Sequence, residues 1–158
     1  MGCPILITDS APSSSHEGCW KKLRWTPDIF HCQGWMAAYI PVLIKKAFKD
    51  EPAFANTKVV TTLFNHGLEG VLGHHFKKTL EYKSIKAATL SEFNTEFDYT
   101  ELEKLAIAFS NGVIEGSEGI KQELLDYADK KGVPVLKYPG SDFTEPYKKF
   151  YEVVYPQK

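Results

Sequence analysis

The sequence predicts an α/β protein in which helices cover both faces of a parallel sheet. Short apolar, β-branched segments alternate along the chain with segments whose apolar residues recur at helical spacing. The chain has 158 residues, of which 43% are hydrophobic and 25% are charged, and these values are typical of one globular domain. Parallel strands end at one edge of their sheet, where such proteins bind ligands.

The strands are predicted from apolar segments that end in polar or glycine-rich turns. They are expected at 28–31, 58–64, 113–115 and 134–136, with a further short strand at 5–7. The segment KVVTTLF at 58–64 is β-branched and apolar, which is typical of a strand buried on both faces. Pro27 disfavours a helix at Thr26, so the strand that follows begins after it.

The helices are predicted from apolar residues spaced at i, i+3, i+4 and i+7. They are expected at 35–49, at 99–110, between Ser117 and Gly132, and around 147–154. Pro41 predicts a kink or a delayed start in the first of them, and Ser117 is a good N-cap for the third. The segment 68–86 is expected to be a loop with one helical piece.

Two regions differ in composition. Residues 1–20 are rich in serine, proline and small residues, which predicts a flexible lead-in before one α/β domain at 21–158. A truncated or frame-altered gene product is an alternative explanation for the poor fit of this lead-in. A sheet that lacked its first strands would have an exposed edge, which would favour a homo-oligomer or a partner at that edge.

Composition argues against several classes of function. The net charge of -1 gives no field that would attract nucleic acid, and no apolar run approaches the roughly 20 residues that span a membrane. Cys3, Cys19 and Cys32 match no zinc or redox spacing, so we expect a reduced, cytoplasmic setting. The sequence predicts no cofactor and no metal site, because the cluster of His66, His74 and His75 has no partner at ligand spacing.

Three loops follow the predicted strands and are the candidate ligand-binding segments, at 31–35, 65–73 and 116–119. In the first, His31 places an imidazole beside an amide at Gln33, and Gly34 lets the backbone come close to a ligand. A buried histidine with satisfied hydrogen bonds and a packed Trp35 are the structural alternative, which composition favours. His31 and Cys32 are adjacent and would face opposite sides of a strand, which argues against a Cys–His nucleophile.

Other candidate residues have a structural explanation or lack a partner that would complete a site. Gly116 and Ser117 could contact a phosphate, but helix capping already explains the serine. Four carboxylates lie near predicted strand ends without a partner that would make a glycosidase pair: Asp28, Glu69, Glu115 and Glu118. Three tryptophans could stack on sugars, but core packing is the favoured explanation for each: Trp20, Trp25 and Trp35.

The run PDIFHCQGWMAAYIPVLIKKAFKDEPAFANTKVVTTLFN at 27–65 resembles the N-terminal catalytic half-domain of bacterial glycogen synthase and plant starch synthase. In that family an H-x-H-D-W motif ends a strand, and a helix with an internal proline follows. A connector K-x-x-x-x-D-P-x-F-x-N-T-K then leads to a strand ending in T-I-H-N. Here the connector is KDEPAFANTK at 49–58, and 106–132 is similar to the family's A-D-x-V-x-x-V-S strand and the helix after it. Short glycogen-synthase-like proteins that carry only the N-terminal half are more similar still.

The resemblance implies a three-layer, Rossmann-like sheet, an incomplete N-terminal half of the GT-B arrangement. Family members transfer glucose from ADP-glucose to an α-1,4-glucan. His31 and Trp35 match the first histidine and the tryptophan of H-x-H-D-W, whereas Gln33 replaces the histidine that contacts the transferred glucose. Gly34 replaces the aspartate, Phe64 replaces the histidine of T-I-H-N, Asn65 keeps the asparagine, and Ser117 lies near the family's serine. The candidate substrate-binding set is therefore His31, Gln33, Gly34, Asn65, Gly116 and Ser117, with a sugar nucleotide or an α-glucan as ligand.

Two parts of the family's machinery have no match in this sequence. They are the K-T-G-G-L loop that grips the donor and the second half-domain with its diphosphate-binding cations. Stabilising a diphosphate leaving group needs preorganised positive charge in a closed site. The resemblance therefore implies a glycogen/starch-synthase-like protein that is inactive alone. A non-catalytic sugar- or protein-binding module is the alternative.

Overall fold

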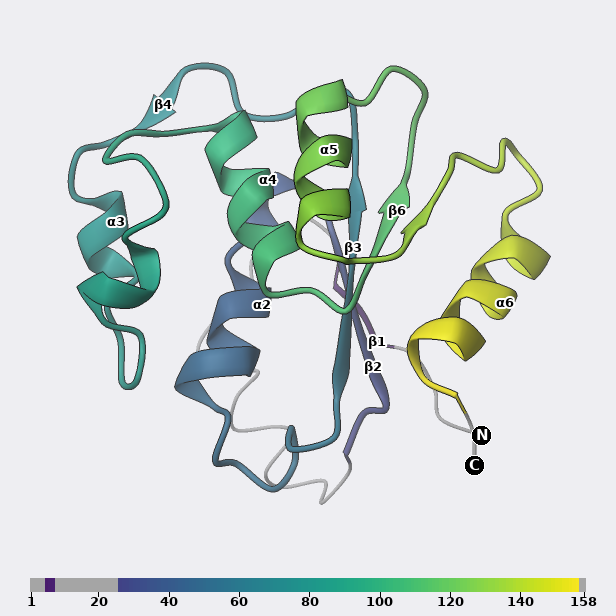
Figure 1. Cartoon of the computed structure of the whole chain (residues 1–158), viewed down its shortest axis with the longest axis horizontal. Helices are drawn as coiled ribbons and strands as arrows, with labels where there is room; N and C mark the ends of the chain where they lie inside the picture. The colour runs from purple at the N-terminus through teal and green to yellow at the C-terminus, as the bar shows by residue number, and fades with distance from the viewer. Residues whose placement is uncertain (1–4, 8–25, 157–158) are drawn as a thin grey trace.

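The computed structural model describes residues 5–7 and 26–156, and its centre is a five-stranded sheet (Figure 1). The strand order is β1-β2-β3-β6-β7 and every pairing is parallel. The strands are β1 (Ile5–Ile7), β2 (Ile29–Gln33), β3 (Lys58–Leu63), β6 (Gly112–Glu115) and β7 (Val135–Leu136). The predicted parallel sheet is thus confirmed.

The strand ends differ by small shifts from those expected. β2 continues two residues past His31, and β6 begins at Gly112 rather than Val113. The segment at 5–7 does form a strand, which pairs with β2. The rest of the lead-in predicted at 1–20 lies outside the described residues.

Helices cover both faces of the sheet, as the alternation predicted (Figure 1). On one face lie α2 (Ile40–Val42), α4 (Tyr99–Ala108) and α5 (Gln122–Lys130), and α6 (Thr144–Val154) covers the other. Leu63 and Val113 pack toward Leu124 of α5. Val60 and Ile114 pack with Phe150 and Val154 of α6. Burial of successive strand residues on opposite faces explains the nearly continuous apolar run of β3.

The segment expected to be one helix at 35–49, kinked or starting late at Pro41, is instead three short helical pieces. A 3₁₀ helix at Trp35–Ala37 is followed by α2 and by a π-helix at Leu43–Ala47. Pro41 lies in the first turn of α2, where its missing N–H costs little. Because Pro41 cannot donate a hydrogen bond to the preceding turn, one regular α-helix cannot extend through it. The prediction of a single helix is therefore wrong, whereas the expected delayed start agrees with the position of Pro41 at the beginning of α2.

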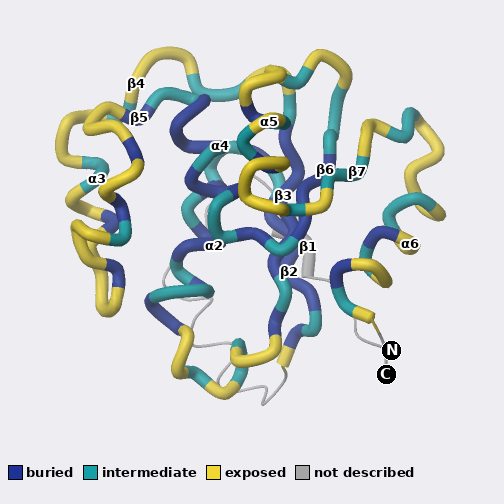
Figure 2. The backbone as a smooth tube through the Cα atoms, in the orientation of Figure 1, coloured by how far each residue is buried: buried dark blue, intermediate teal, exposed yellow. Residues whose placement is uncertain are grey.

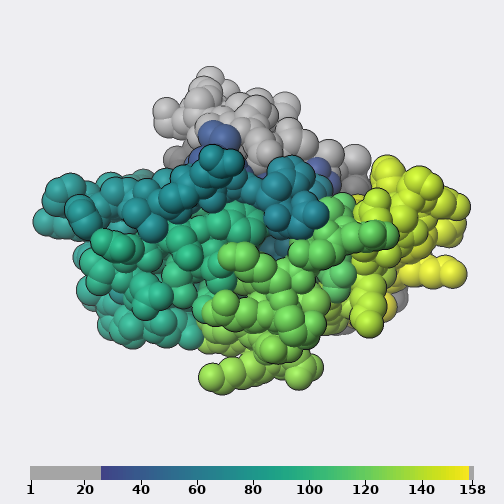
Figure 3. Space-filling model, turned by 90° about the horizontal axis from the view of Figure 1, so that it is seen from above, coloured from purple at the N-terminus to yellow at the C-terminus, as the bar shows by residue number. Residues whose placement is uncertain are grey.

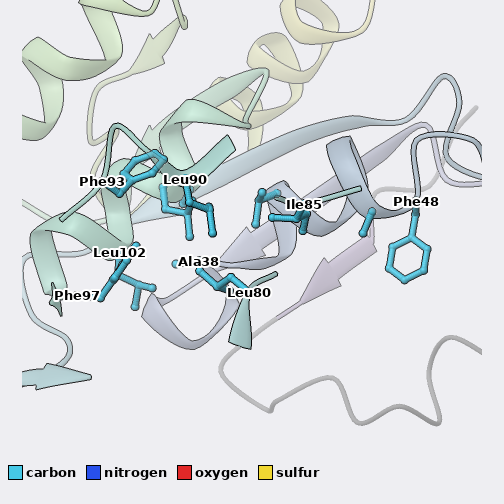
Figure 4. Packing of buried hydrophobic residues seen from close by; sticks show 12 residues of the cluster. Ala38, Phe48, Leu80, Ile85, Leu90, Phe93, Phe97 and Leu102 are labelled. Carbon is cyan, nitrogen blue, oxygen red and sulfur yellow. The ribbon is translucent and has the colours of Figure 1, made fainter. Parts of the chain in front are cut away.

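The segment before α4 is more structured than the sequence indicated. It contains β4 (Val71–Leu72), α3 (Phe76–Thr79), a 3₁₀ helix at Ala87–Leu90 and β5 (Phe97–Asp98). β4 and β5 pair in an antiparallel two-stranded sheet. The expected helical piece is α3, but a two-residue strand is too short to show the alternation that would predict it. Figure 4 shows the buried side chains that hold this segment against α4, among them Leu80, Ile85, Leu90, Phe93, Phe97 and Leu102.

One edge of the main sheet is β7, which has only two residues. Pro134 precedes it and Lys137 follows it. Short edge strands with flanking proline and lysine oppose pairing with another chain. Association through a sheet edge therefore stays a prediction, and this edge does not favour it.

Across the described ranges, 5–7 and 26–156, the model contains no helix with the length and apolar character that crossing a membrane requires.

A substitution in β6 tests the close packing of α6. A Cβ on Gly112 would lie 2.7 Å from Cγ2 of Val154 and 2.9 Å from Cε1 of Phe150, so Gly112→Ala must displace these α6 side chains or the helix that carries them. We expect it to lower the free energy of unfolding by about 1–3 kcal/mol, measured by urea denaturation. Gly73→Ala is the control, because a Cβ at Gly73 meets no atom within 4 Å. Equal stability of the two variants would contradict the packing described.

Candidate functional site

The candidate site lies at the edge where β2, β3 and β6 end. Gln33 of β2 pairs with Thr62 of β3, and Leu63 of β3 pairs with Glu115 of β6, so the three strands end side by side. We call the loops that follow them, at 33–35, 64–67 and 116–119, the rim. Figure 3 looks down on this edge and shows the loops after β3 and β6 at the surface next to each other. Figure 2 shows these loops above the buried strands.

A direct hydrogen bond joins two of the predicted site residues. The backbone N–H of Asn65 donates to Oγ of Ser117 over 2.8 Å. Beside it, the N–H of Gly116 donates to the carbonyl of Leu63, also over 2.8 Å. The sheet thus brings together residues that lie 52 positions apart in the sequence.

The prediction that Ser117 caps the following helix is wrong. α5 begins at Gln122, and Lys121 occupies its N-cap position without a side-chain capping bond. The Ser117 hydroxyl instead accepts the hydrogen bond from Asn65. Serine suits both roles because its oxygen accepts from any nearby backbone N–H, so the residue type alone could not separate them.

The two glycines of the predicted site have structural reasons for being glycine. Gly34 has φ 79° and ψ 161°, a conformation that is essentially restricted to glycine. A Cβ on Gly116 would lie 2.4 Å from Cγ2 of Thr62 and 2.8 Å from Cε1 of Phe64. Both residues therefore shape the rim, and neither needs a ligand to explain it.

His31 lies beneath the rim rather than on it. Its side chain has no exposed surface, and it faces Tyr151 of α6. Nδ1 is 2.6 Å from Oη of Tyr151, and Nε2 is 2.6 Å from Oγ1 of Thr62. A neutral imidazole has one donor and one acceptor, and the two hydroxyls satisfy both. The histidine is packed as the structural alternative expected, and it does not reach the rim surface.

Burial also determines the protonation states of His31 and of the titratable groups near it. It lowers the pKa of His31 to about 4, so the imidazole is neutral at pH 7. It raises the pKa of Tyr151 to about 12. Cys32 faces the opposite side of the sheet, among Phe30 and Val59, and burial raises the pKa of its thiol. The expectation that His31 and Cys32 cannot act as a nucleophile pair is therefore confirmed.

The rim carries side-chain amides at Gln33 and Asn65, and its exposed polar residues also include His66 and Glu118. Gln33 ends β2 and is half-buried, and Asn65 is exposed. The Asn65 side-chain oxygen lies 2.9 Å from Nδ1 of His66. Trp35 is half-buried and packs against the large apolar cluster of α4, as favoured from the sequence. Trp20 and Trp25 lie outside the described residues.

A residue that the sequence did not indicate also contacts the rim. The hydroxyl of Tyr99, at the start of α4, donates to the carbonyl of Phe64. A Cβ on Gly67 would lie 2.2 Å from Cε2 of Tyr99 and 3.3 Å from Cδ1 of Trp35. Tyr99 and Phe64 are 35 residues apart, and no motif links them.

The described residues include no metal site, and two of the four candidate carboxylates lie at opposite edges of the sheet. No group of three His, Cys, Asp or Glu side chains within 5–7 and 26–156 could hold a metal ion. His66 contacts Asn65, and Nδ1 of His74 is 3.6 Å from a carboxylate oxygen of Glu96. Asp28 precedes β2 and so lies at the opposite edge from Glu115, which ends β6.

Two surface cavities lie away from the central rim residues. One of about 360 Å³ is mostly apolar and is lined by Tyr39, Leu43, Phe48, Phe76, Thr79, Leu80 and Tyr82. The other, of about 670 Å³, is polar and includes Asp98, Glu101, Lys104, Lys121 and Glu123. Neither includes Gln33, Asn65 or Ser117.

Comparisons with known proteins agree on one family. A family model described as the starch synthase catalytic domain matches residues 14–136. A glycogen synthase of Chlorobium luteolum is 32% identical over 104 residues, which are 65% of this chain and 21% of the relative. One of Koribacter versatilis is 44% identical over 50 residues, which are 32% of this chain and 10% of the relative.

A solved structure has the same fold. The catalytic domain of starch synthase IV from Arabidopsis thaliana, bound to ADP and acarbose, matches with a TM-score of 0.57 and 15% identity. The match covers 78% of this chain and 27% of that one. The matched segments therefore span between 10% and 27% of the lengths of these larger proteins.

The buried His31 predicts a specific pH dependence. Its pKa is about 4 in the folded chain against an ordinary value of 6.5, so folding opposes its protonation. The associated stability is complete above pH 6.5 and is lost as the pH falls toward 4. Between pH 7.5 and 5.0 we expect the wild type to lose about 2 kcal/mol more than His31→Gln in urea denaturation.

His75→Gln is the control, because it replaces an exposed histidine that lies outside the sheet. An NMR titration of the His31 imidazole gives an independent check on the folded wild type. A midpoint near 6.5 would show that the ring is accessible to water, contrary to its position under α6.

Proposed function

Because the chain belongs to the starch synthase catalytic domain family, we propose that its rim binds the sugar units of an α-1,4-glucan. The observation that supports this proposal is the hydrogen bond that fixes Asn65 against Ser117 at the carboxyl edge of the sheet. Ligands of open parallel sheets bind at this edge. Gln33 ends the neighbouring strand at the same edge and adds a second side-chain amide.

The chemistry of the rim favours an uncharged ligand. The rim, at 33–35, 64–67 and 116–119, contains neither lysine nor arginine, but it contains Glu118, and Glu69 and Glu115 lie beside it in the sequence. Amides and hydroxyls donate to and accept from sugar hydroxyls, whereas a diphosphate requires positive charge. The neighbouring starch synthase IV domain is bound to both ADP and acarbose. Of these two ligand classes, the described rim suits the sugar better than the nucleotide.

Transfer of glucose is not expected from this chain alone. In transfer from a sugar nucleotide, negative charge develops on the diphosphate, and catalysis requires preorganised cations in a closed site. The described rim segments offer none, and the chain spans only 21% of the Chlorobium luteolum glycogen synthase. We therefore propose a sugar-binding part of the synthase architecture. Its cytoplasmic location stays a prediction.

Titration with maltohexaose followed by NMR tests the binding proposal. We expect shifts of the Asn65 and Gln33 side-chain amides at millimolar sugar, with weaker shifts for ADP-glucose. Asn65→Ala should weaken maltohexaose binding about fivefold, which corresponds to one hydrogen bond of about 1 kcal/mol. Asn94→Ala is the matched control, because Asn94 is also exposed but lies outside the rim. Unchanged spectra at about 20 mM maltohexaose, a concentration high enough to reveal even very weak binding, would contradict the proposal.

Incubation with labelled ADP-glucose and glycogen tests the absence of transfer. We expect no incorporation above that of a sample without protein, because the described rim has no cation for the diphosphate. A full-length glycogen synthase serves as the positive control. Steady, protein-dependent incorporation by this chain alone would contradict this part of the proposal.

A further inference from the structure

We infer that Tyr99 is a positioning residue of the rim, which fixes the loop 64–67 so that the Asn65 side chain meets the sugar in one orientation. The effect on sugar binding depends on the function proposed above, but the effect on the loop does not. The inference is based on contacts at the two ends of this loop.

The first contact holds a peptide plane from both sides. The Tyr99 hydroxyl donates to the carbonyl oxygen of Phe64, and the N–H of Asn65 donates to Ser117. This carbonyl and this N–H belong to the same peptide group, which is planar and rigid. Two side chains from separate elements therefore fix the orientation of the plane from which the Asn65 side chain projects.

The second contact holds the far end of the loop. The Tyr99 ring occupies the space where a side chain at Gly67 would lie, with Cε2 and Cδ2 at 2.2 and 2.4 Å from an ideal Cβ. Cδ1 of Trp35 lies 3.3 Å from the same point. The loop therefore passes directly over the tyrosine ring, and glycine at 67 makes this approach sterically feasible.

Tyr99 itself is held by a rigid element. It is the first residue of α4, and the Asp98 side chain caps this helix by accepting from the N–H of Glu101 over 2.8 Å. Leu102 and Leu105 of the same helix are buried in the core. Because this helix is packed and capped, the Tyr99 side chain has a fixed position and can hold the loop that it contacts in one conformation.

Loss of this support should weaken binding without removing any group that contacts the sugar. A loop that must be ordered on binding loses part of the binding free energy to that ordering. We expect Tyr99→Phe, which keeps the ring and removes the hydroxyl, to raise the Kd for maltohexaose threefold to tenfold. It should also speed hydrogen exchange at the Asn65 backbone N–H in the sugar-free chain, because the peptide plane is then held from one side only.

Tyr127→Phe is the matched control. Its hydroxyl donates to Glu92 over 3.3 Å at an exposed site away from the rim, so both readouts should equal those of the wild type. Gly67→Ala is a second test that keeps the Tyr99 hydroxyl. Its methyl group overlaps the ring, so the loop or the ring must move, and the same two readouts should change.

The two readouts separate this inference from the proposed function. Unchanged Asn65 exchange in Tyr99→Phe would overturn the inference, and so would faster exchange with an unchanged Kd. Maltohexaose that fails to bind the wild type would refute the proposed function and the binding effect with it. Exchange at Asn65 would still decide whether Tyr99 orders the loop.

Discussion

The parallel pairing of β3 with both β2 and β6 is the constraint on which the rest of the structure depends. Asn111 fixes the start of the β3–β6 pair, because its side-chain oxygen accepts from the N–H of Val59 and its own N–H donates to the Val59 carbonyl. The bond from the N–H of Gly116 to the carbonyl of Leu63 fixes its end. A shift of one residue would turn every side chain to the other face and expose the buried run of β3. The meeting of Asn65 and Ser117 follows directly from this register.

Strand parity also explains why His31 and Gln33 have different roles. The two residues are two positions apart, so they lie on the same face of β2. His31 lies under α6, where Tyr151 and Thr62 satisfy its ring, whereas Gln33 is at the end of the strand and is only half-buried. In a sequence, a histidine near the end of a strand resembles a ligand-binding residue. The helix that covers His31 is about 120 residues away in the chain, so the local sequence does not show that this histidine is buried.

The sequence predicted those features that depend on local patterns. Apolar periodicity indicated α4 and α6, and the β-branched run indicated β3. Contacts between distant segments could not be predicted in this way. Ser117 has the chemistry of a helix cap and of a loop anchor, and only the fold decides between the two. A tyrosine is compatible with any position of an amphipathic helix, so no local pattern indicates the contact of Tyr99 with Phe64. The sequence therefore predicted the loops of the rim, but it did not predict which residues of different loops contact one another.

The geometry of the rim and its charge have separate origins. Backbone hydrogen bonds and tight glycine contacts at Gly116 and Gly67 set the geometry, and they tolerate few substitutions. Exposed side chains set the charge, and surface substitutions usually change stability by less than about 0.5 kcal/mol. A chain can therefore keep the edge of a glycosyltransferase sheet while the ligand that this edge accepts changes. At 15% identity, the similarity to starch synthase IV shows the fold, and the side chains of the rim determine what it binds.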